Sequence, residues 1–240
     1  MKIEILYPEL CNLFGDAMNA EYLRRAIPEA EFVNTTLKTR PGFLDGDVGL
    51  VYMGAMTESA QTLAADALRP FKEQLVERID GGTAFLITGN ALELFGTRIE
   101  NEDGSYEDML GVFELYARRQ MMRRYSSIYL GTFGDMDIVG FKSQFAFSHD
   151  SGDGGVPAAF KTLRGAGRKP EQVEEGVRIN NFIATYVLGP LLVMNPPFAR
   201  YMLNLLGVEE RELPYERAAR AAYDARLSEF RDPRTGVVYT

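Results

Sequence analysis

The stretch Thr83–Gly96 constrains the fold more than any other part of the chain. It opens with an apolar run, Ala84–Ile87, that is too short for a helix and has no polar alternation. Such a run is typical of a strand buried on both faces of a parallel sheet. Thr88, Gly89 and Asn90 interrupt the run, and apolar residues then resume as a short helix. A strand, a tight elbow and a helix place the elbow at the carboxyl edge of the sheet, beside N–H groups that can hold an anion or oxyanion. Many folds place a nucleophile at such an elbow, but this one carries no cysteine.

The segments before this stretch alternate between strand-like and helical patterns. We expect strands at Lys2–Tyr7, Glu31–Thr36 and Val48–Met53, and helices ending at about Ala26 and covering Ser59–Ile79. Gly81 should end the second of these helices in the left-handed conformation. This order of elements predicts a parallel sheet with right-handed crossovers and helices on both faces.

The pattern changes beyond residue 100, where short β-like runs predict an antiparallel extension of the sheet. The runs are Leu110–Tyr116, Tyr125–Phe133 and Asp137–Phe147, and loops are expected at Ser148–Gly155 and Gly165–Pro170. A buried strand and turn at Phe182–Leu192, a helix from Asn195 to about Leu206 and an amphipathic helix at about 214–230 follow. We therefore expect the α/β class, with residues 1–240 forming a single domain around a central, mostly parallel sheet.

Composition narrows the class of protein. One cysteine excludes an internal disulfide and a cysteine-based zinc site, and we expect neither a metal nor a cofactor. A formal net charge of −8 argues against nucleic acid as a partner. No apolar run approaches the roughly 20 residues that span a bilayer, and the first residues lack a signal-peptide pattern. We therefore expect a cytoplasmic protein without a membrane span.

Four stretches, in order along nearly the whole chain, resemble the class I glutamine amidotransferase fold in its cobyric-acid-synthase-like branch. They are Leu6–Asn19, Leu86–Gly96, Ile138–Phe141 and Thr185–Asn195. They are similar to the family's opening strand and turn, its nucleophile elbow, the strand before its Glu-Asn-His, and its Thr-Tyr-Leu-His-Gly-Pro-Leu-Leu motif. Within that branch, the chain resembles the glutaminase subunits of lipid II isoglutaminyl synthases. The resemblance implies a subunit that supplies ammonia to a Mur-ligase-like partner, which amidates glutamate in the peptidoglycan precursor.

The catalytic residues of that family are absent from the matching positions. An ungapped comparison puts Gly89 where the nucleophilic cysteine belongs, and a one-residue shift puts Thr88 there. Leu188 occupies the position of the catalytic histidine. Lys142–Gln144 stand in place of Glu-Asn-His, and Met53–Met56 replace a glycine-rich oxyanion loop. Because loss of a nucleophile or base costs about a million-fold in rate, we expect no glutaminase activity.

Residues around these motifs are candidates for binding a ligand. They are Gly54, Ala55, Asn90, Arg123 and Gln144. Arg123 belongs to a basic cluster at Arg118–Arg124, which we interpret as a solvated face, with recognition of a carboxylate or phosphate as the alternative. Asp16 and Asn19 match the family's opening motif, and we favour helix capping as their role.

Other side chains could carry relocated chemistry. Cys11 could be a displaced nucleophile, but a small buried hydrophobic residue is the favoured interpretation. His149, the single histidine, is expected in a surface loop, because a histidine base needs a nucleophile and an orienting group beside it. Thr88 could be a nucleophile if a base contacts it, but the sequence shows no such base, and a hydrogen bond at the strand end is favoured.

Three functional hypotheses follow, in order of preference. The first is a degenerate glutaminase-like subunit that binds or scaffolds a Mur-ligase-like or other amide-forming partner. The second is a small-molecule binding protein that uses the former active-site crevice without turnover. The third is an amidotransferase with relocated chemistry. A neighbouring gene for a Mur-ligase-like protein would favour the first, and a tightly retained ligand in the purified protein would favour the second.

Overall fold

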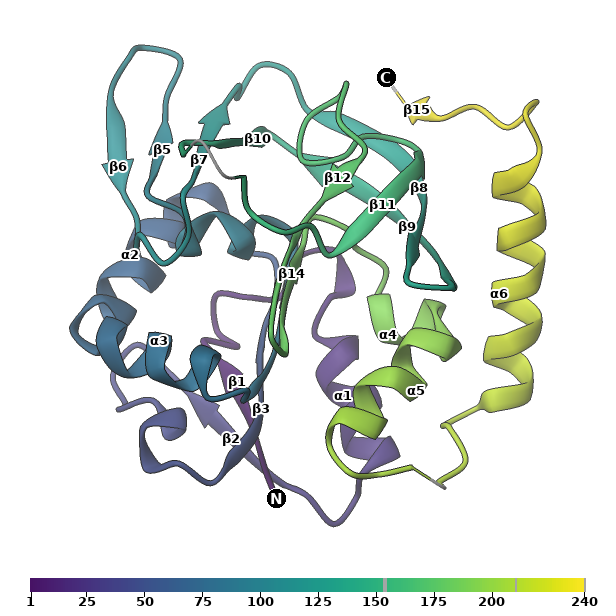
Figure 1. Ribbon diagram of the computed structural model, residues 1–240, viewed down its shortest axis with the longest axis horizontal. Coiled ribbons are helices and arrows are strands. Elements are labelled where there is room, and N and C mark those ends of the chain that lie inside the picture. Colours follow the sequence, from purple (N-terminus) through teal and green to yellow (C-terminus); the bar gives the residue numbers. More distant parts are fainter. Residues whose placement is uncertain (153–154, 210, 240) are drawn as a thin grey trace.

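The computed structural model describes residues 1–152, 155–209 and 211–239, and a six-stranded sheet forms its centre (Figure 1). The strands are β1 (Lys2–Leu6), β2 (Glu31–Thr35), β3 (Val48–Met53), β4 (Ala84–Thr88), β13 (Val177–Ile179) and β14 (Phe182–Thr185). They run in the order β13-β14-β4-β3-β1-β2, and only the β13–β14 pair is antiparallel. The apolar run of the elbow stretch forms β4, which is buried throughout between β3 and β14. The expected α/β class with a mostly parallel sheet is confirmed.

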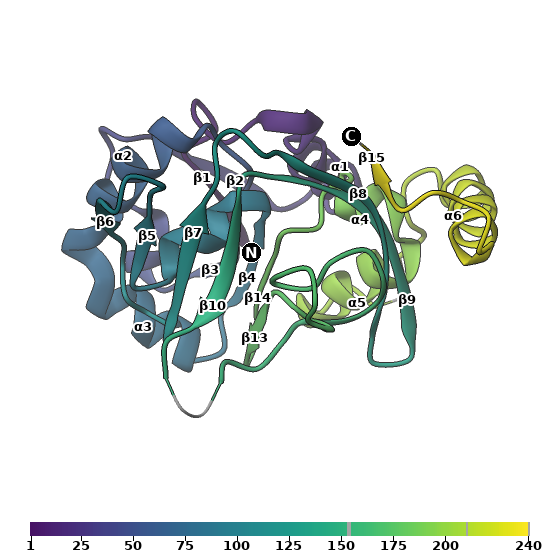
Figure 2. The same ribbon diagram turned by 90° about the horizontal axis from the view of Figure 1, so that it is seen from above.

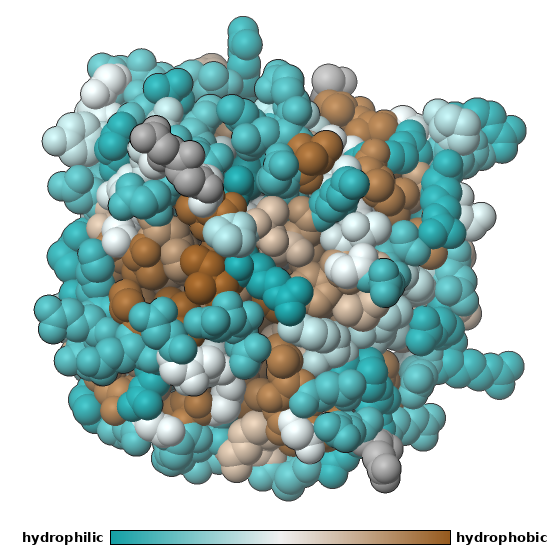
Figure 3. All heavy atoms as spheres, in the orientation of Figure 1, coloured by the Kyte–Doolittle hydropathy of each residue, from teal (hydrophilic) through white to brown (hydrophobic). Residues whose placement is uncertain are grey.

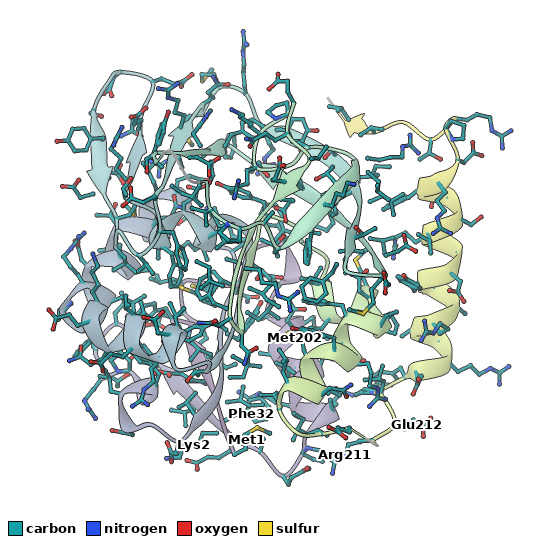
Figure 4. All side chains as sticks on the ribbon, viewed as in Figure 1. Met1, Lys2, Phe32, Met202, Arg211 and Glu212 are labelled. Carbon is teal, nitrogen blue, oxygen red and sulfur yellow. The ribbon has the colours of Figure 1, made fainter. Side chains whose placement is uncertain are left out.

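Helices cover both faces of this sheet (Figure 1). On one face lie α1 (Met18–Ala26), α4 (Leu191–Met194) and α5 (Pro196–Leu205), and on the other lie α2 (Glu58–Leu68) and α3 (Lys72–Asp80). Alternate residues along each strand supply the two apolar clusters, as the twofold period of a strand requires: Leu86 faces the α1 side and Phe85 faces the α2 side. Figure 4 labels Phe32 of β2 and Met202 of α5, which belong to the α1-side cluster.

The chain beyond residue 96 builds two further sheets, which Figure 2 shows beside the central one. The first contains β5 (Arg98–Glu100), β6 (Tyr106–Asp108), β7 (Leu115–Arg119) and β10 (Ala146–Asp150). The second contains β8 (Tyr125–Phe133), β9 (Met136–Gln144), β11 (Phe160–Arg164), β12 (Glu174–Glu175) and β15 (Val238–Tyr239). These sheets are mostly antiparallel, as expected, but they are separate from the central sheet and do not extend it, and the β5–β7 pair is parallel. The last helix, α6 (Glu216–Arg231), packs Tyr223 and Phe230 against the second sheet.

Several expected boundaries were wrong. The helix expected at Ser59–Ile79 is divided by a 3₁₀ turn at Arg69–Phe71, because Pro70 has no N–H with which to continue the helical ladder. Gly81 keeps a right-handed backbone, and Gly82, with φ +83°, takes the left-handed position. The helix after the elbow is a 3₁₀ helix, Gly89–Phe95.

The strand expected at Leu110–Tyr116 lies later, as β7, and the single strand expected at Asp137–Phe147 divides between β9 and β10. The loop expected at Ser148–Gly155 begins inside β10, and its residues 153 and 154 lie outside the described residues. No helix in the described part of the chain is long and apolar enough to cross a bilayer. Polar side chains cover most of the face seen in Figure 3, and apolar ones gather left of its centre.

Candidate functional site

The topology opens a crevice at the carboxyl ends of the neighbouring strands β1 and β3. The chain leaves β1 for α1 on one face of the sheet, and it leaves β3 for α2 and α3 on the other. The two connections diverge at this point, where open α/β sheets bind ligands. Here the strand-end residues Leu6 and Met53 are buried. The elbow after β4 borders this crevice, since β4 pairs with β3.

A buried polar network forms the floor of the crevice. Its centre is Asp16, whose carboxylate accepts hydrogen bonds from Asn19 Nδ2 at 2.8 Å, from the Ala55 N–H at 3.2 Å and from Thr88 Oγ1. Tyr52 donates its hydroxyl to the Asp16 backbone carbonyl at 2.7 Å. Burial raises the pKa of Asp16, and the surrounding donors oppose this rise. The network therefore ties the β1–α1 connection to the ends of β3 and β4.

This network revises two of the sequence interpretations. Asp16 and Asn19 are not helix caps, because α1 begins at Met18 without a side-chain cap bond. Thr88 has a carboxylate partner in Asp16, which the sequence did not indicate as a base. Both side chains are almost fully buried, at 0% and 1% exposure, so the hydroxyl is closed to a substrate.

The elbow residue Gly89 sits in a space that has no room for a side chain. Its backbone adopts φ +65°, in the left-handed region that favours glycine. A Cβ built at Gly89 would lie 2.5 Å from the Cβ of Ala55 and 3.1 Å from Cδ2 of Leu188. Leu188 is buried beside the elbow, where its backbone exchanges two hydrogen bonds with Phe141 of β9. Leu188 therefore lies in contact with the elbow.

Gly89→Ala should lower the free energy of unfolding by about 2–4 kcal/mol, from left-handed strain plus overpacking against Ala55. Gly134→Ala is the matched control, since Gly134 has φ +56° and no heavy atom within 4 Å of a built Cβ. It should lose only the strain contribution, about 1 kcal/mol. Urea unfolding of both variants measures the difference. Equal losses would mean that the elbow can accommodate a side chain.

The loop after β3 has two of its amide donors occupied by side chains. The Ala55 N–H donates to Asp16, and the Met56 N–H donates to Asn90 Oδ1 at 3.0 Å. Asn90 completes a pair by donating Nδ2 to the Met56 carbonyl at 2.8 Å, and Gln61 Nε2 donates to the Asn90 carbonyl at 2.9 Å. Oxyanion stabilisation needs donors aimed at the reacting atom, and these two N–H groups are already used inside the protein.

The space remaining at the elbow is a cavity of about 40 Å³. Ala55, Asn90 and Gln144 line it, so three of the expected ligand-binding candidates meet there. Gly54 and Arg123 are not among the lining residues. Arg124 of the basic cluster also lines the cavity, and the sequence did not indicate Phe14, Glu58 or Phe145, which come from three further segments. The volume admits a water molecule and falls well below the 300 Å³ or more of typical ligand pockets.

The basic cluster is not one solvated face. Arg118 is exposed and donates to Glu100 at 2.8 Å, whereas Arg119 is buried and donates to Gln61 Oε1 at 2.8 Å. Arg124 stacks its guanidinium over the ring of Phe145, 5.0 Å from the centroid. Alternation along β7 explains the split between Arg118 and Arg119, since successive side chains point to opposite faces.

Cys11 and His149 lie apart from the elbow cavity. Cys11 is buried, and desolvation raises the pKa of its thiol to about 12, so it packs as a small hydrophobic residue. His149 lies on β10 instead of in the expected loop, half-buried, with its ring stacked on Tyr116 at 5.2 Å. Lys142, the first residue in place of Glu-Asn-His, is fully buried and forms an ion pair with Glu175 at 3.1 Å.

Known proteins share this architecture. No protein-family model matches the sequence. A crystal structure of a glutamine amidotransferase aligns with a TM-score of 0.56 and 17% identity, covering 86% of this chain and 99% of that one. A second glutamine amidotransferase, from Thermotoga maritima, aligns with a TM-score of 0.52 and 10% identity, covering 95% of this chain and 94% of that one. The fold is therefore glutamine amidotransferase-like.

A curated relative agrees with this fold. The lipid II isoglutaminyl synthase (glutamine-hydrolyzing) subunit GatD of Staphylococcus aureus (strain N315) is 27% identical over 210 residues. The match covers 85% of this chain and 83% of that protein. The resemblance found from four short motifs, to glutamine amidotransferases and to the glutaminase subunit of this synthase, is confirmed.

Proposed function

We propose that this chain is a catalytically degenerate glutamine amidotransferase-like subunit that binds or scaffolds an amide-forming, Mur-ligase-like synthetase in the cytoplasm. The observation that carries the proposal is the elbow itself. Gly89 has no side chain and no room for one, and Leu188 fills the adjoining space where a base would be needed. Glutamine hydrolysis requires an activated nucleophile and a base that takes its proton.

The donors around the elbow support the same conclusion. The N–H groups of Ala55 and Met56 are bonded to Asp16 and Asn90 and are not free to stabilise an oxyanion. The relative named above is a subunit of a synthase, which supports a role for this chain within an assembly.

The two alternatives receive less support. A small-molecule ligand in the former active-site crevice would need more space than the cavity of about 40 Å³ provides. Relocated chemistry at Thr88 has a carboxylate partner in Asp16, but both groups are sealed beneath the elbow. Relocated chemistry at Cys11 would need a thiolate, and the pKa of this thiol lies far above neutral pH.

The expected result is that the purified chain releases no ammonia from glutamine above background, alone or with its synthetase. The synthetase, identified by co-purification from the native host, should use ammonium and should not use glutamine as a nitrogen source. Cys11→Ala and Thr88→Ala are compared with the unmodified chain in the same assay. Because the elbow lacks a nucleophile, neither substitution should change the background rate.

Three outcomes would contradict the proposal in different ways. Glutamine-dependent ammonia release that Thr88→Ala abolishes would establish relocated chemistry at the elbow. Release that only Cys11→Ala abolishes would place the nucleophile in the connection between β1 and α1. Failure to recover any synthetase, together with a retained small molecule, would favour the ligand-binding alternative.

A further inference from the structure

A cluster of cationic and aromatic side chains lies on the outer face of the sheet β10-β7-β5-β6, away from the elbow. The register pairs His149 of β10 with Tyr116 of β7, and Phe147 with Arg118. These four side chains share one face, because residues two apart on a strand point the same way. The opposite face of β7 and β10 is buried, so these strands present their aromatic and cationic side chains outward.

This face is a layered arrangement of cations and rings. The guanidinium groups of Arg98 and Arg118 lie 4.9 and 5.2 Å from the ring centroid of Tyr116, on which His149 also stacks. Glu100 accepts hydrogen bonds from both arginines, at 2.6 and 2.8 Å. One carboxylate therefore fixes two guanidinium groups, and the face keeps an excess of positive charge in a chain whose net charge is −8.

The segment 169–171 lies across the edge of this face and forms one wall of a pocket. The Ser148 N–H of the edge strand β10 donates to the Arg168 carbonyl at 3.2 Å, which holds the segment against the strand. A cavity of about 290 Å³ lies between them, lined by Arg118, Gln120, Phe147, His149, Lys169 and Glu171, with Pro170 beside them. This volume is close to the lower end of small-molecule pockets.

The charges within this pocket do not cancel. Lys169 forms no ion pair with any residue that the structure describes, and Glu171 is the one acidic residue among those lining the cavity. Burial lowers the pKa of His149, and the positive charges of Lys169 and Arg118 lower it further. Glu100 and Asp150 oppose that effect. An anion in the cavity would relieve the repulsion between the charges of Arg118 and Lys169 and would favour protonation of His149.

We propose that this cavity binds a small anion carried on an aromatic ring, of the class of aryl carboxylates or aryl phosphates. Arg118 and Lys169 hold the anionic group, the first through the fork of its guanidinium. The ring lies against Phe147, which supplies an apolar surface beside the cationic groups. The site is separate from the elbow and does not depend on the proposed function.

The test uses His149, the single histidine of the chain, as a reporter whose pKa is read from its ring resonances by NMR. Phenylacetate is the probe, since its charge stays constant through the histidine titration. At saturation and constant ionic strength, the pKa of His149 should rise by at least about 0.3 units, because the bound carboxylate stabilises the imidazolium. Acetate has the charge without the ring, and benzyl alcohol has the ring without the charge.

Three charge-removing variants make the test specific. Lys169→Gln should weaken phenylacetate binding about threefold or more, and Glu171→Gln should strengthen it about twofold, because the carboxylate competes with the ligand. Lys38→Gln, a change at an exposed lysine outside the cavity lining, should leave the affinity unchanged. An unchanged His149 pKa, or equal effects of Lys169→Gln and Lys38→Gln, would overturn the proposal. Equal affinities for acetate and phenylacetate would overturn its aromatic part.

Discussion

Glu175→Gln is expected to lower the free energy of unfolding by about 3–5 kcal/mol, because it leaves a fully buried lysine charge without its partner. Glu175 and Lys142 are both at 0% exposure and lie 3.1 Å apart. The Lys142 ammonium also donates to the Gly167 carbonyl at 2.8 Å and lies 5.4 and 5.5 Å from the ring centroids of Tyr129 and Tyr186. Burial lowers the pKa of Lys142, and Glu175 is the group that opposes this shift.

The same carboxylate anchors the end of β14. Glu175 accepts from Thr185 Oγ1 at 2.6 Å and from the Tyr186 N–H at 2.9 Å, so its loss also weakens the segment that carries Leu188 to the elbow. The double variant Lys142→Met with Glu175→Gln is the matched control. It removes both charges and keeps a side-chain acceptor, and it should recover at least about half of the loss. Urea unfolding gives both values, and a single-variant loss below about 1 kcal/mol would contradict the interpretation of a paired buried charge.

The central sheet was predictable from the sequence because its signals are local. Val48–Met53 became β3 with the expected bounds, and the apolar run at the elbow became the central strand β4. A strand buried on both faces must be apolar at every position, and nothing distant in the sequence is needed to recognise it. The predicted bounds were wrong for the helix after β3, where the apolar periodicity continues but Pro70 interrupts the helical hydrogen bonds.

The floor of the crevice was not predictable in the same way. Asp16, Asn19, Tyr52 and Thr88 come from the β1–α1 connection, α1, β3 and β4, and only the tertiary fold brings them together. A carboxylate or amide just before a helix is most often a cap, so the local interpretation preferred that role. The available signal was the position of Asp16 after the end of β1, at the point where the connections diverge.

The environments of charged residues in the two sheets beyond residue 96 were also not predictable from local sequence. Arg118 and Arg119 are neighbours in the sequence, yet one is exposed and the other is buried on Gln61. Their difference in exposure can be predicted only if β7 is recognised as a strand, because side chains alternate along it. The sequence placed that strand several residues earlier. The lysine that stands in place of Glu-Asn-His gave no sequence signal that its partner would be Glu175, on a strand of two residues.

Glu93→Gln is expected to change the pH dependence of stability through a buried acid in the helix that follows the elbow. Glu93 Oε2 accepts from Gln61 Nε2 at 2.8 Å, and Gln61 Oε1 accepts from Arg119. Burial raises the pKa of Glu93 to about 7, while Gln61, Arg119 and Tyr186 oppose this rise. The folded protein therefore holds a proton that the unfolded chain releases near its ordinary pKa of 4.5.

The sign follows from which state binds more protons. Between about pH 4.5 and 7 the folded state binds more, so the contribution of protonated Glu93 is complete at low pH and is lost as the pH rises through about 7. The whole difference amounts to about 3 kcal/mol. Glutamine resembles the protonated acid in shape and does not ionise. Glu93→Gln should therefore match the unmodified protein at about pH 5 and exceed it in stability at about pH 8.

Urea unfolding of both proteins from about pH 5 to 8 measures this difference, and comparing the two removes the contribution of other buried acids such as Asp16. Glu107→Gln is the control of opposite sign. Burial raises the pKa of Glu107, but Thr62, Asn101 and Arg119 together outweigh it and lower the pKa, so its carboxylate is the form that the fold favours. That variant should be less stable than the unmodified protein by a nearly constant amount across this pH range, because Glu107 is ionised in both states above its ordinary pKa of 4.5. The loss should stay below about 1 kcal/mol, because Glu107 is partly exposed. If Glu93→Gln shows the same direction as Glu107→Gln, Glu93 is ionised in the folded protein, and Arg119 outweighs burial at that position.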